Sequence, residues 1–424
     1  MEKKLENGLN IIIEEIPYVR SISFGIWVKN GSVKESAEEN GASHFIEHML
    51  FKGTKNRSAK DIAREMDSIG GQINAYTTRE YTCFYTRVLD THADNAMDIL
   101  SDMFFNSAFD ADGVRRERNV INEEIDMYED APDEVCYDLL YDGMWKGSPM
   151  GRPILGTKDT ISAFDSEFLK SYMRKNYRCG NTVISAAGNF EAEEMLKKIE
   201  RIFGSWKSEK EPEISQKSSV EYNVCTITKP KDIEQVHMIM AFPALKRGSE
   251  EKYTLAVLNM AFGGSMGSRL FQHIREDKGL TYSIFSSVSA YEDCGVFTIY
   301  AAMNPAQCEE VVISILGEIK RIFTEKLDDE IINNTKQQFI SNIIMGNENI
   351  QNRMMGMGAS KLLLGEYKGV EEDIRQIEAV SCEKIYSLAE RLFDMEKMSL
   401  CAVGKVEDID FKGIVQRGIK KYFS

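Results

Sequence analysis

Apolar and polar residues follow two different periods along this chain of 424 residues. Segment 72–89 alternates apolar and polar positions, which predicts a long strand with one buried face. Segments 93–105 and 309–323 place apolar residues three and four positions apart, which predicts amphipathic helices. Shorter apolar runs at 21–29 and 237–245 predict buried strands. Because the strands do not fall into a strand–helix–strand rhythm, we expect an α+β fold with mainly antiparallel sheets and helices packed on one face.

This pattern occurs twice along the chain. The stretch that begins ISAFDSEFLKSYMRKNY at Ile161 corresponds to the stretch that begins IEAVSCEKIYSLAERLF at Ile377, which lies 216 residues later. Gly188 and Gly404 close the apolar strand that follows each stretch, and they keep the same offset. A shared composition would also make two halves look alike, but the ungapped agreement over about thirty residues favours a duplication.

The duplication predicts two homologous halves. We expect one α+β domain over 1–206 and a second over 220–424. The charged, polar stretch 207–219 (KSEKEPEISQKSS) has the composition of an exposed linker between them.

The charge of the chain limits its partners. There are 52 basic and 67 acidic residues, which gives a formal net charge of −15. Such a charge argues against nucleic acid or an anionic membrane surface as a partner. No apolar run approaches the roughly 18 residues of a membrane-spanning helix, so we expect none.

The N-terminal residues and the cysteines indicate the compartment. The apolar run at 11–13 is too short for a secretory signal, and Glu14 and Glu15 end it. The 8 cysteines include no CxxC pair, and in a long chain without a signal we expect them to be reduced. These features predict a cytoplasmic protein.

One short segment has histidines at a spacing that suits a metal ion. His44, Glu47 and His48 lie in GASHFIEHMLFKGT. On a helix the two histidines share a face one turn apart and can hold one zinc ion, with Glu47 beside them. This HxxEH pattern is the inverted form of the HExxH motif of zinc proteases. The alternative is two histidines on an ordinary helix.

The expected helix of this motif runs over 40–51. Asn40 or Ser43 can cap its N-terminus, and Gly53 ends it.

A catalytic zinc site needs a third protein ligand. The predicted helix 110–128 offers Glu117 and Glu124, which lie two turns apart on one edge. One of them can bind the metal while the other orients a histidine. Taken alone, the two residues also fit the solvated face of a helix.

The start of segment 72–89 is polar, which suits a strand at the edge of a sheet. Such a strand can pair with an extended peptide through main-chain hydrogen bonds. An ordinary strand is the alternative.

With these residues the chain resembles the M16 family of zinc metallopeptidases, the inverzincins. In that family HxxEH is followed by a ligand glutamate, and an acidic residue stands seven positions before that ligand. Glu124 follows His48 by 76 residues and Glu117 precedes it by seven, as in the family. The resemblance therefore implies one zinc ion per chain, held by His44, His48 and Glu124.

The resemblance covers essentially the whole chain, including the duplication. It implies the LuxS-like fold of the family. The chain length is similar to that of the processing-peptidase subgroup, which is related to the beta subunit of the mitochondrial processing peptidase and to pitrilysin. The family's INAxT signature resembles Ile73, Asn74, Ala75, Tyr76 and Thr77, and implies that a peptide substrate docks there.

The second half lacks HxxEH, since Met260 and Gly264 stand at the offset positions of the two histidines. It carries instead Arg275 and Tyr282, which resemble an Arg/Tyr pair that the family places over the substrate. Both side chains can donate to a developing oxyanion. In the family two such chains face each other, which implies a homodimer sharing this pair in trans, or a heterodimer with an M16-like partner.

These observations predict a zinc-dependent endopeptidase that cleaves extended peptides or leader sequences. Glu47 would act as general base, with Glu117 supporting His48. One alternative is a non-catalytic M16-like subunit that binds peptides or has a structural role. Another is a hydrolase of substrates other than peptides.

Overall fold

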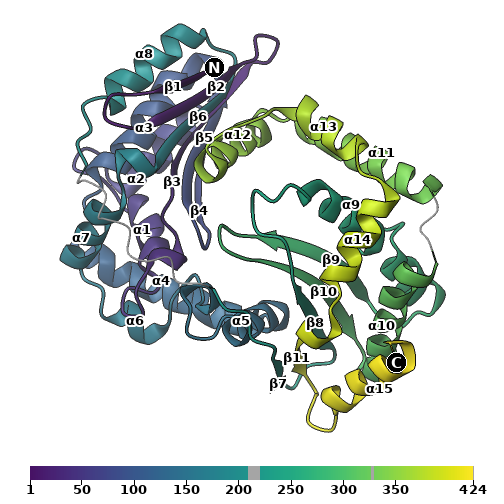
Figure 1. Ribbon diagram of the computed structural model, residues 1–424. Coiled ribbons are helices and arrows are strands. Elements are labelled where there is room, and N and C mark those ends of the chain that lie inside the picture. Colours follow the sequence, from purple (N-terminus) through teal and green to yellow (C-terminus); the bar gives the residue numbers. More distant parts are fainter. Residues whose placement is uncertain (209–219, 326–328, 424) are drawn as a thin grey trace. The chain divides into compact units, whose positions relative to one another are not determined.

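A computed structural model describes residues 1–208, 220–325 and 329–423 of the chain, which forms two compact units (Figure 1). The first unit contains Met1–Asp126, a segment that begins at Arg152, and Met345–Tyr367. The second contains Met127–Gly151, a segment that ends at Ile344, and the C-terminal part from Lys368. Each unit therefore includes a short segment from the other half of the chain.

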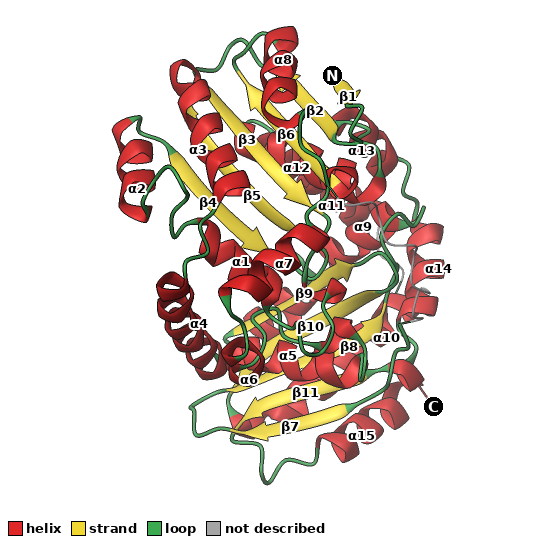
Figure 2. Cartoon of the chain, turned by 90° about the vertical axis from the view of Figure 1, so that its left-hand side faces the viewer, coloured by secondary structure: helices red, strands yellow, loops and turns green. Residues whose placement is uncertain are grey.

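The first unit is built on a six-stranded sheet in the order β1-β2-β6-β3-β5-β4 (Figure 2). All neighbouring strands are antiparallel except β2 and β6. Strand β4 lies at the free edge of this sheet. The strands are β1 (Glu2–Lys4), β2 (Asn10–Glu15), β3 (Ser21–Val28), β4 (Gln72–Thr77), β5 (Thr82–Leu89) and β6 (Thr182–Gly188).

The expected single strand over 72–89 is wrong, because it is a hairpin of β4 and β5. The two strands are joined at Thr78, whose N–H donates to the carbonyl of Tyr81 at 2.8 Å. The turn contains no glycine or proline, so the alternation of side chains hid it.

Helices cover one face of the first sheet and enclose its main core. The largest side chains of this core include Phe24, Phe45 and Phe84, each at most 1% exposed. The helices of this unit are α1 (Ala42–Leu50), α2 (Ala59–Ser68), α3 (Ala93–Asn106), the first part of α4 (Ala111–Asp130), α6 (Lys158–Ser162), α7 (Ser166–Asn176), α8 (Ala192–Phe203) and α12 (Ile350–Leu364).

The second unit has a five-stranded sheet in the order β7-β11-β8-β10-β9. Its strands are β7 (Thr226–Pro230), β8 (Val236–Pro243), β9 (Ser283–Ala290), β10 (Gly295–Met303) and β11 (Ser399–Gly404). Its helices are α5 (Pro132–Met144), α9 (Lys252–Phe262), α10 (Cys308–Thr324), α11 (Asp329–Gly346, to Ile344), α13 (Val370–Glu378), α14 (Cys382–Leu392) and α15 (Phe411–Phe423), with a π-helical segment η5 (Phe271–Asp277).

The two sheets confirm the duplication. The order β2-β6-β3-β5-β4 in the first unit matches β7-β11-β8-β10-β9 in the second, and the first pair is parallel in both. Gly188 and Gly404 end the matching strands with φ values of 140° and 141°. At both places the chain turns in a conformation that favours glycine, so the α+β fold with two homologous halves is confirmed.

The two copies exchange one helix each. Helix α5, from the first half of the chain, packs on β8 and β11 of the second unit, where Cys136 Sγ lies 3.4 Å from the carbonyl oxygen of Cys401. Helix α12, from the second half, packs on the matching strands β3 and β6 of the first unit (Figure 1). The compact units therefore depart from the expected division into 1–206 and 220–424 at these two helices. Most of the expected linker 207–219 lies outside the described residues.

Helix α12 covers the second face of the first sheet, where the sequence pattern predicted helices on one face. It approaches closely because Gly358 lies against Trp27: a Cβ at this glycine would stand 2.2 Å from the indole Nε1. That indole nitrogen donates to Ser185 Oγ at 2.7 Å. Met354 and Met357 of α12 also belong to this second, smaller core.

Among the described residues, no helix is both long enough and apolar enough to cross a membrane.

Candidate metal centre

Helix α1 carries the HxxEH residues and is held at its N-terminus by a buried carboxylate. The oxygens of Glu35 accept hydrogen bonds from the backbone N–H of Ser43 at 2.7 Å and of Gly41 at 2.8 Å. Glu35 is 2% exposed. A negative charge at a helix N-terminus satisfies free N–H groups and matches the helix dipole. The expected cap at Asn40 or Ser43 is therefore wrong, because Glu35 from the preceding loop takes that place.

Two imidazoles and one carboxylate meet between α1 and α4. The rings of His44 and His48 have centroids 4.5 Å apart. Glu124 Oε2 lies 3.6 Å from His44 Nε2 and 3.4 Å from His48 Nε2. One ligand atom from each residue lies within 4.8 Å of the others. The structure thus brings together the three residues expected to bind metal.

This donor set fits a zinc ion. Zinc bonds of roughly 2.0–2.2 Å in a tetrahedron place the ligand atoms roughly 3.3–3.6 Å apart. The distances from Glu124 Oε2 to the two Nε2 atoms, 3.6 and 3.4 Å, agree with such a tetrahedron. Two histidines and one glutamate also leave a fourth position open, as catalytic zinc sites do.

Glu117 lies behind His48 rather than in the ligand cluster. Its Oε1 is 2.8 Å from His48 Nδ1, and its side chain is 3% exposed. A carboxylate that accepts the Nδ1 proton leaves Nε2 free to bind a metal. The structure thus brings Glu117 into contact with His48, and its supporting role stays a prediction. His44 Nδ1, in contrast, is buried and has no hydrogen-bond partner among the described residues.

The surroundings shift the pKa values of the two histidines in opposite directions. Burial, and then the neighbouring His48, lower the pKa of His44. Burial also acts to lower the pKa of His48, but hydrogen bonds to Glu117 and Glu124 outweigh it and raise that pKa to about 9. In the metal-free chain His48 therefore holds a proton at neutral pH, and His44 does not.

Glu47 lies on α1 beside the ligands and is tied to the edge strand. Thr77 Oγ1 at the end of β4 donates to Glu47 Oε2 at 2.6 Å. Burial raises the pKa of Glu47, and the Thr77 hydrogen bond and the nearby His48 oppose this effect. A partly buried carboxylate with a raised pKa is suited to accept a proton.

The free edge of β4 turns backbone groups away from the sheet. The N–H of Thr78 donates to the carbonyl of Tyr81 across the hairpin. Because the backbone groups of successive residues in a strand point to opposite sides, the N–H and C=O groups of Thr77 and Ala75 point to the free edge. The N–H of Ala75 there donates to the side chain of Asn74 at 2.8 Å.

Tyr76 lies on the opposite face of β4 from Thr77. Its ring centroid is 6.3 Å from that of Trp27, and its hydroxyl is 3.8 Å from the sulfur of Met355 on α12. The structure therefore brings the side chain of Tyr76 to the second core and not to Glu47.

Arg275 and Tyr282 lie in the second unit. The guanidinium of Arg275, in η5, stands 4.6 Å from the ring centroid of Phe271. Tyr282 is 75% exposed, and its N–H donates to the carbonyl of Ala302. Their roles stay predictions.

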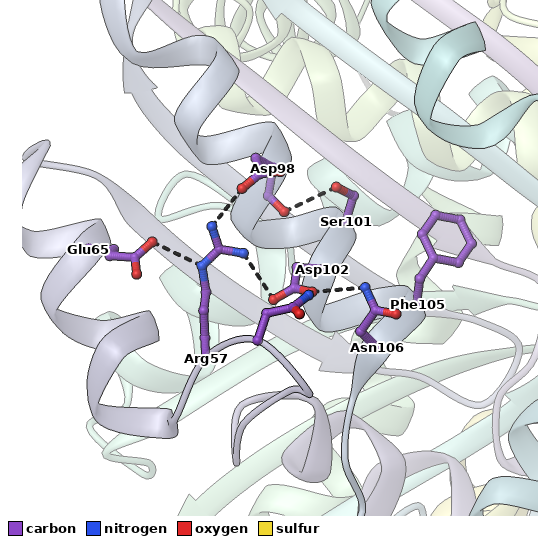
Figure 3. A pocket seen from close by; sticks show the side chains of 8 residues that line it. Arg57, Glu65, Asp98, Ser101, Asp102, Phe105 and Asn106 are labelled. Atoms are coloured by element: carbon purple, nitrogen blue, oxygen red, sulfur yellow. Dashed lines mark hydrogen bonds and ion pairs between the residues drawn. The ribbon is translucent and has the colours of Figure 1, made fainter.

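A second group of acidic residues lines a cavity of about 450 Å³ beside α2 and α3 (Figure 3). Arg57 reaches into it and lies within 2.6 to 2.9 Å of oxygens of Glu65, Asp98 and Asp102. The single guanidinium contacts all three carboxylates, so this group ties the loop after α1 to α2 and α3.

Sequence reasoning missed two residues near the centre. The sequence around Glu35 does not indicate a helix cap, because Glu35 reaches the N–H groups of Gly41 and Ser43 only when its loop folds back on α1. Lys52, which lies 2.8 Å from Glu117 Oε2, stands four residues after His48, and that spacing would have placed it on the same helix face.

Comparisons with known proteins agree with this geometry. A family model described as insulinase (peptidase family M16) matches residues 10–158. A second, described as the peptidase M16 inactive domain, matches residues 163–339.

Curated relatives match nearly the whole chain. The uncharacterized zinc protease YmxG of Bacillus subtilis (strain 168) is 42% identical over 388 residues, which cover 92% of this chain and 94% of the relative. The uncharacterized zinc protease SCO5738 of Streptomyces coelicolor is 36% identical over 411 residues, which cover 95% and 89%.

Solved structures share the fold. A protease from Helicobacter pylori superposes with a TM-score of 0.88 at 19% identity, over 95% of this chain and 99% of that one. A peptidase M16 inactive domain from Pseudomonas fluorescens also gives 0.88, at 16% identity, over 95% and 97%.

Proposed function

Because this chain belongs to the M16 (insulinase) family of peptidases, we propose that it is a zinc-dependent endopeptidase that cleaves extended peptides or leader sequences. The observation that carries the proposal is the convergence of His44, His48 and Glu124, with Glu47 beside them. In chemical terms this arrangement has three ligands and a neighbouring base, which is what metal-assisted hydrolysis requires.

Each residue of the centre has a separate task in this proposal. His44, His48 and Glu124 hold the metal, and Glu117 keeps His48 in place. A bound zinc ion supplies Lewis acidity, which makes a water easier to deprotonate and a carbonyl easier to attack. Glu47 takes the proton from the attacking water and later gives it to the leaving amine.

The free edge of β4 is the proposed binding place of the peptide. An extended substrate would pair with the outward backbone groups of Ala75 and Thr77. To accept such a strand, the N–H of Ala75 has to exchange its present bond to Asn74 for a bond to the peptide. This exchange costs little, because one hydrogen bond replaces another. Peptides without a strand-like segment would be poor substrates.

Arg275 and Tyr282 are the proposed donors to the oxyanion that forms at the scissile carbonyl. We propose that they act in a homodimer, in which each chain completes the other's site. The alternative is a heterodimer with an M16-like partner. Mixing Glu47→Gln chains with Tyr282→Phe chains tests it: recovered activity in the mixture supports sharing in trans, and a mixture as inactive as its parts contradicts it.

The proposal places the enzyme in the cytoplasm, with peptides rather than nucleic acid or membranes as partners. The alternative of a non-catalytic subunit has less support, because this chain keeps each residue of the metal motif. A hydrolase of other substrates has less support, because β4 lies at a free sheet edge with which an extended peptide could pair.

The experiment that tests the proposed function is mass spectrometry of a peptide mixture incubated with the purified chain. We expect internal cleavages that stop when a zinc chelator is added and return when zinc is restored. An unchanged peptide mixture with the zinc-loaded chain would favour the non-catalytic alternative, and cleavage that the chelator does not affect would refute the metal mechanism.

A further inference from the structure

The carboxylate of Glu117 connects two side chains of the segment that carries the metal-binding histidines. Its Oε1 lies 2.8 Å from His48 Nδ1, and its Oε2 lies 2.8 Å from the ammonium nitrogen of Lys52. His48 and Lys52 are four residues apart. A single carboxylate from α4 therefore connects the last turn of α1 to Lys52, two residues past the end of that helix.

The local backbone brings Lys52 to this place. The N–H of Lys52 donates to the carbonyl of Met49 at 3.1 Å, a turn that carries the chain two residues past the end of α1 at Leu50. Gly53 then adopts a φ of 114°, a conformation open to glycine, and the chain turns away. A positive charge at this end of a helix is also favoured by the helix dipole. The ammonium group thus has a defined position.

Glu117 is much more buried than Lys52. Its side chain is 3% exposed, whereas that of Lys52 is 38% exposed. A buried carboxylate needs a partner for each oxygen. Among the described residues, Lys52 is the partner of Oε2, and without it this oxygen would lose its hydrogen bond. The carboxylate would then rotate or draw in water, and either change alters the angle at which Oε1 meets His48.

We propose that Lys52 is a positioning residue of the metal centre, which holds Glu117 so that Glu117 holds His48 with its Nε2 towards the metal. The inference rests on the metal site of the proposed function. It adds Lys52 to that site as the residue that contacts Glu117. Lys52 itself touches neither the metal ligands' donor atoms nor the substrate. Because Lys52 is itself 38% exposed, water can take the place of its ammonium group at Oε2, so the effect of its loss is expected in metal affinity more than in stability.

The test is the zinc affinity of the full-length chain, measured by competition with a chromophoric chelator at one pH. Loss of an outer partner of a metal ligand typically weakens binding by about 10–100-fold. We expect Lys52→Met to weaken zinc binding by about tenfold, at the low end of that range, and Lys52→Gln to do the same. Lys52→Arg, which keeps the charge, should stay within about threefold of the natural chain. The matched control is Lys55→Met, an exposed lysine three residues further on, which should bind zinc like the natural chain.

A second comparison separates positioning from a general effect of charge. In a Glu117→Gln background, Lys52→Met should add less than about threefold, because the residue through which Lys52 acts is already changed. The cobalt(II)-substituted chain should show a shifted absorption spectrum in Lys52→Met and an unshifted one in Lys55→Met.

The inference is overturned if Lys52→Met and Lys52→Gln bind zinc like the natural chain. It is equally overturned if the loss is as large in the Glu117→Gln background. Since these measurements do not need turnover, they remain decisive if the chain binds zinc but cleaves no peptide. If the natural chain binds no zinc, the proposed function fails, which is a separate result.

Discussion

Thr77 donates a hydrogen bond of 2.6 Å to Glu47, and so links the end of the free edge strand to the proposed general base. Glu47 belongs to α1, three residues after His44, and Thr77 ends β4. The residue that orients the base therefore lies on the strand where we propose that peptides bind. The hydroxyl group of Thr77 therefore connects the proposed peptide-binding edge of β4 to the carboxylate of Glu47.

Removal of that hydroxyl should change the pH dependence of cleavage. Burial raises the pKa of Glu47, and the hydrogen bond from Thr77 lowers it, so Thr77→Val should raise it further. A base must be deprotonated to act, so the acidic limb of kcat/KM should move to higher pH by about one unit. Thr77→Ser keeps the donor and should leave the limb in place. An unmoved limb in Thr77→Val would show that this hydrogen bond does not tune the base.

Zinc binding should release a proton from His48. Hydrogen bonds to Glu117 and Glu124 outweigh burial and raise the pKa of His48 in the metal-free chain to about 9. Between pH 6 and 8 that proton must leave before Nε2 binds a metal, so the apparent affinity should rise by about tenfold per pH unit. His44, whose pKa is lowered, should add nothing in this range.

Zinc titrations by calorimetry in buffers of different ionisation enthalpy measure this proton. Glu117→Gln removes one of the interactions that raise the His48 pKa, so its affinity should depend less steeply on pH. An affinity that is constant from pH 6 to 8 in the natural chain would contradict the protonated state of His48.

The exchanged helix α12 should depend on one glycine. A Cβ at Gly358 would stand 2.2 Å from Trp27 Nε1, so Gly358→Ala should destabilise the fold by about 1–3 kcal/mol. Gly356 on the same helix has no atom within 4 Å of such a Cβ, so Gly356→Ala should stabilise by about 0.5–1 kcal/mol. Urea unfolding followed by tryptophan fluorescence compares the two. Equal effects of both changes would mean that α12 does not lie against Trp27.

The metal centre could be predicted from the sequence because its signals are local or have a fixed spacing. His44 and His48 share a helix face by their separation alone. The choice of Glu124 over Glu117 as ligand needed the family spacing, since both lie on one helix edge. The structure separates them, with Glu124 near both Nε2 atoms and Glu117 at Nδ1 of His48.

The features that the sequence did not predict depend on contacts between distant segments. Glu35 caps α1 only after its loop folds back, and nothing around Glu35 indicates a cap. The exchange of α5 and α12 left no signal, because an amphipathic or glycine-containing helix does not show which sheet it will cover. The hairpin at Thr78 was hidden because β4 and β5 continue the same alternation through a turn of ordinary residues.

The central claim is that a zinc ion held by His44, His48 and Glu124 drives peptide cleavage with Glu47 as base. Its most direct test is the zinc content and the turnover of Glu47→Gln beside the natural chain. The account predicts one zinc per chain in both proteins, and a loss of cleavage of at least about 10²-fold in the variant only. Near-normal turnover by zinc-loaded Glu47→Gln would contradict the account.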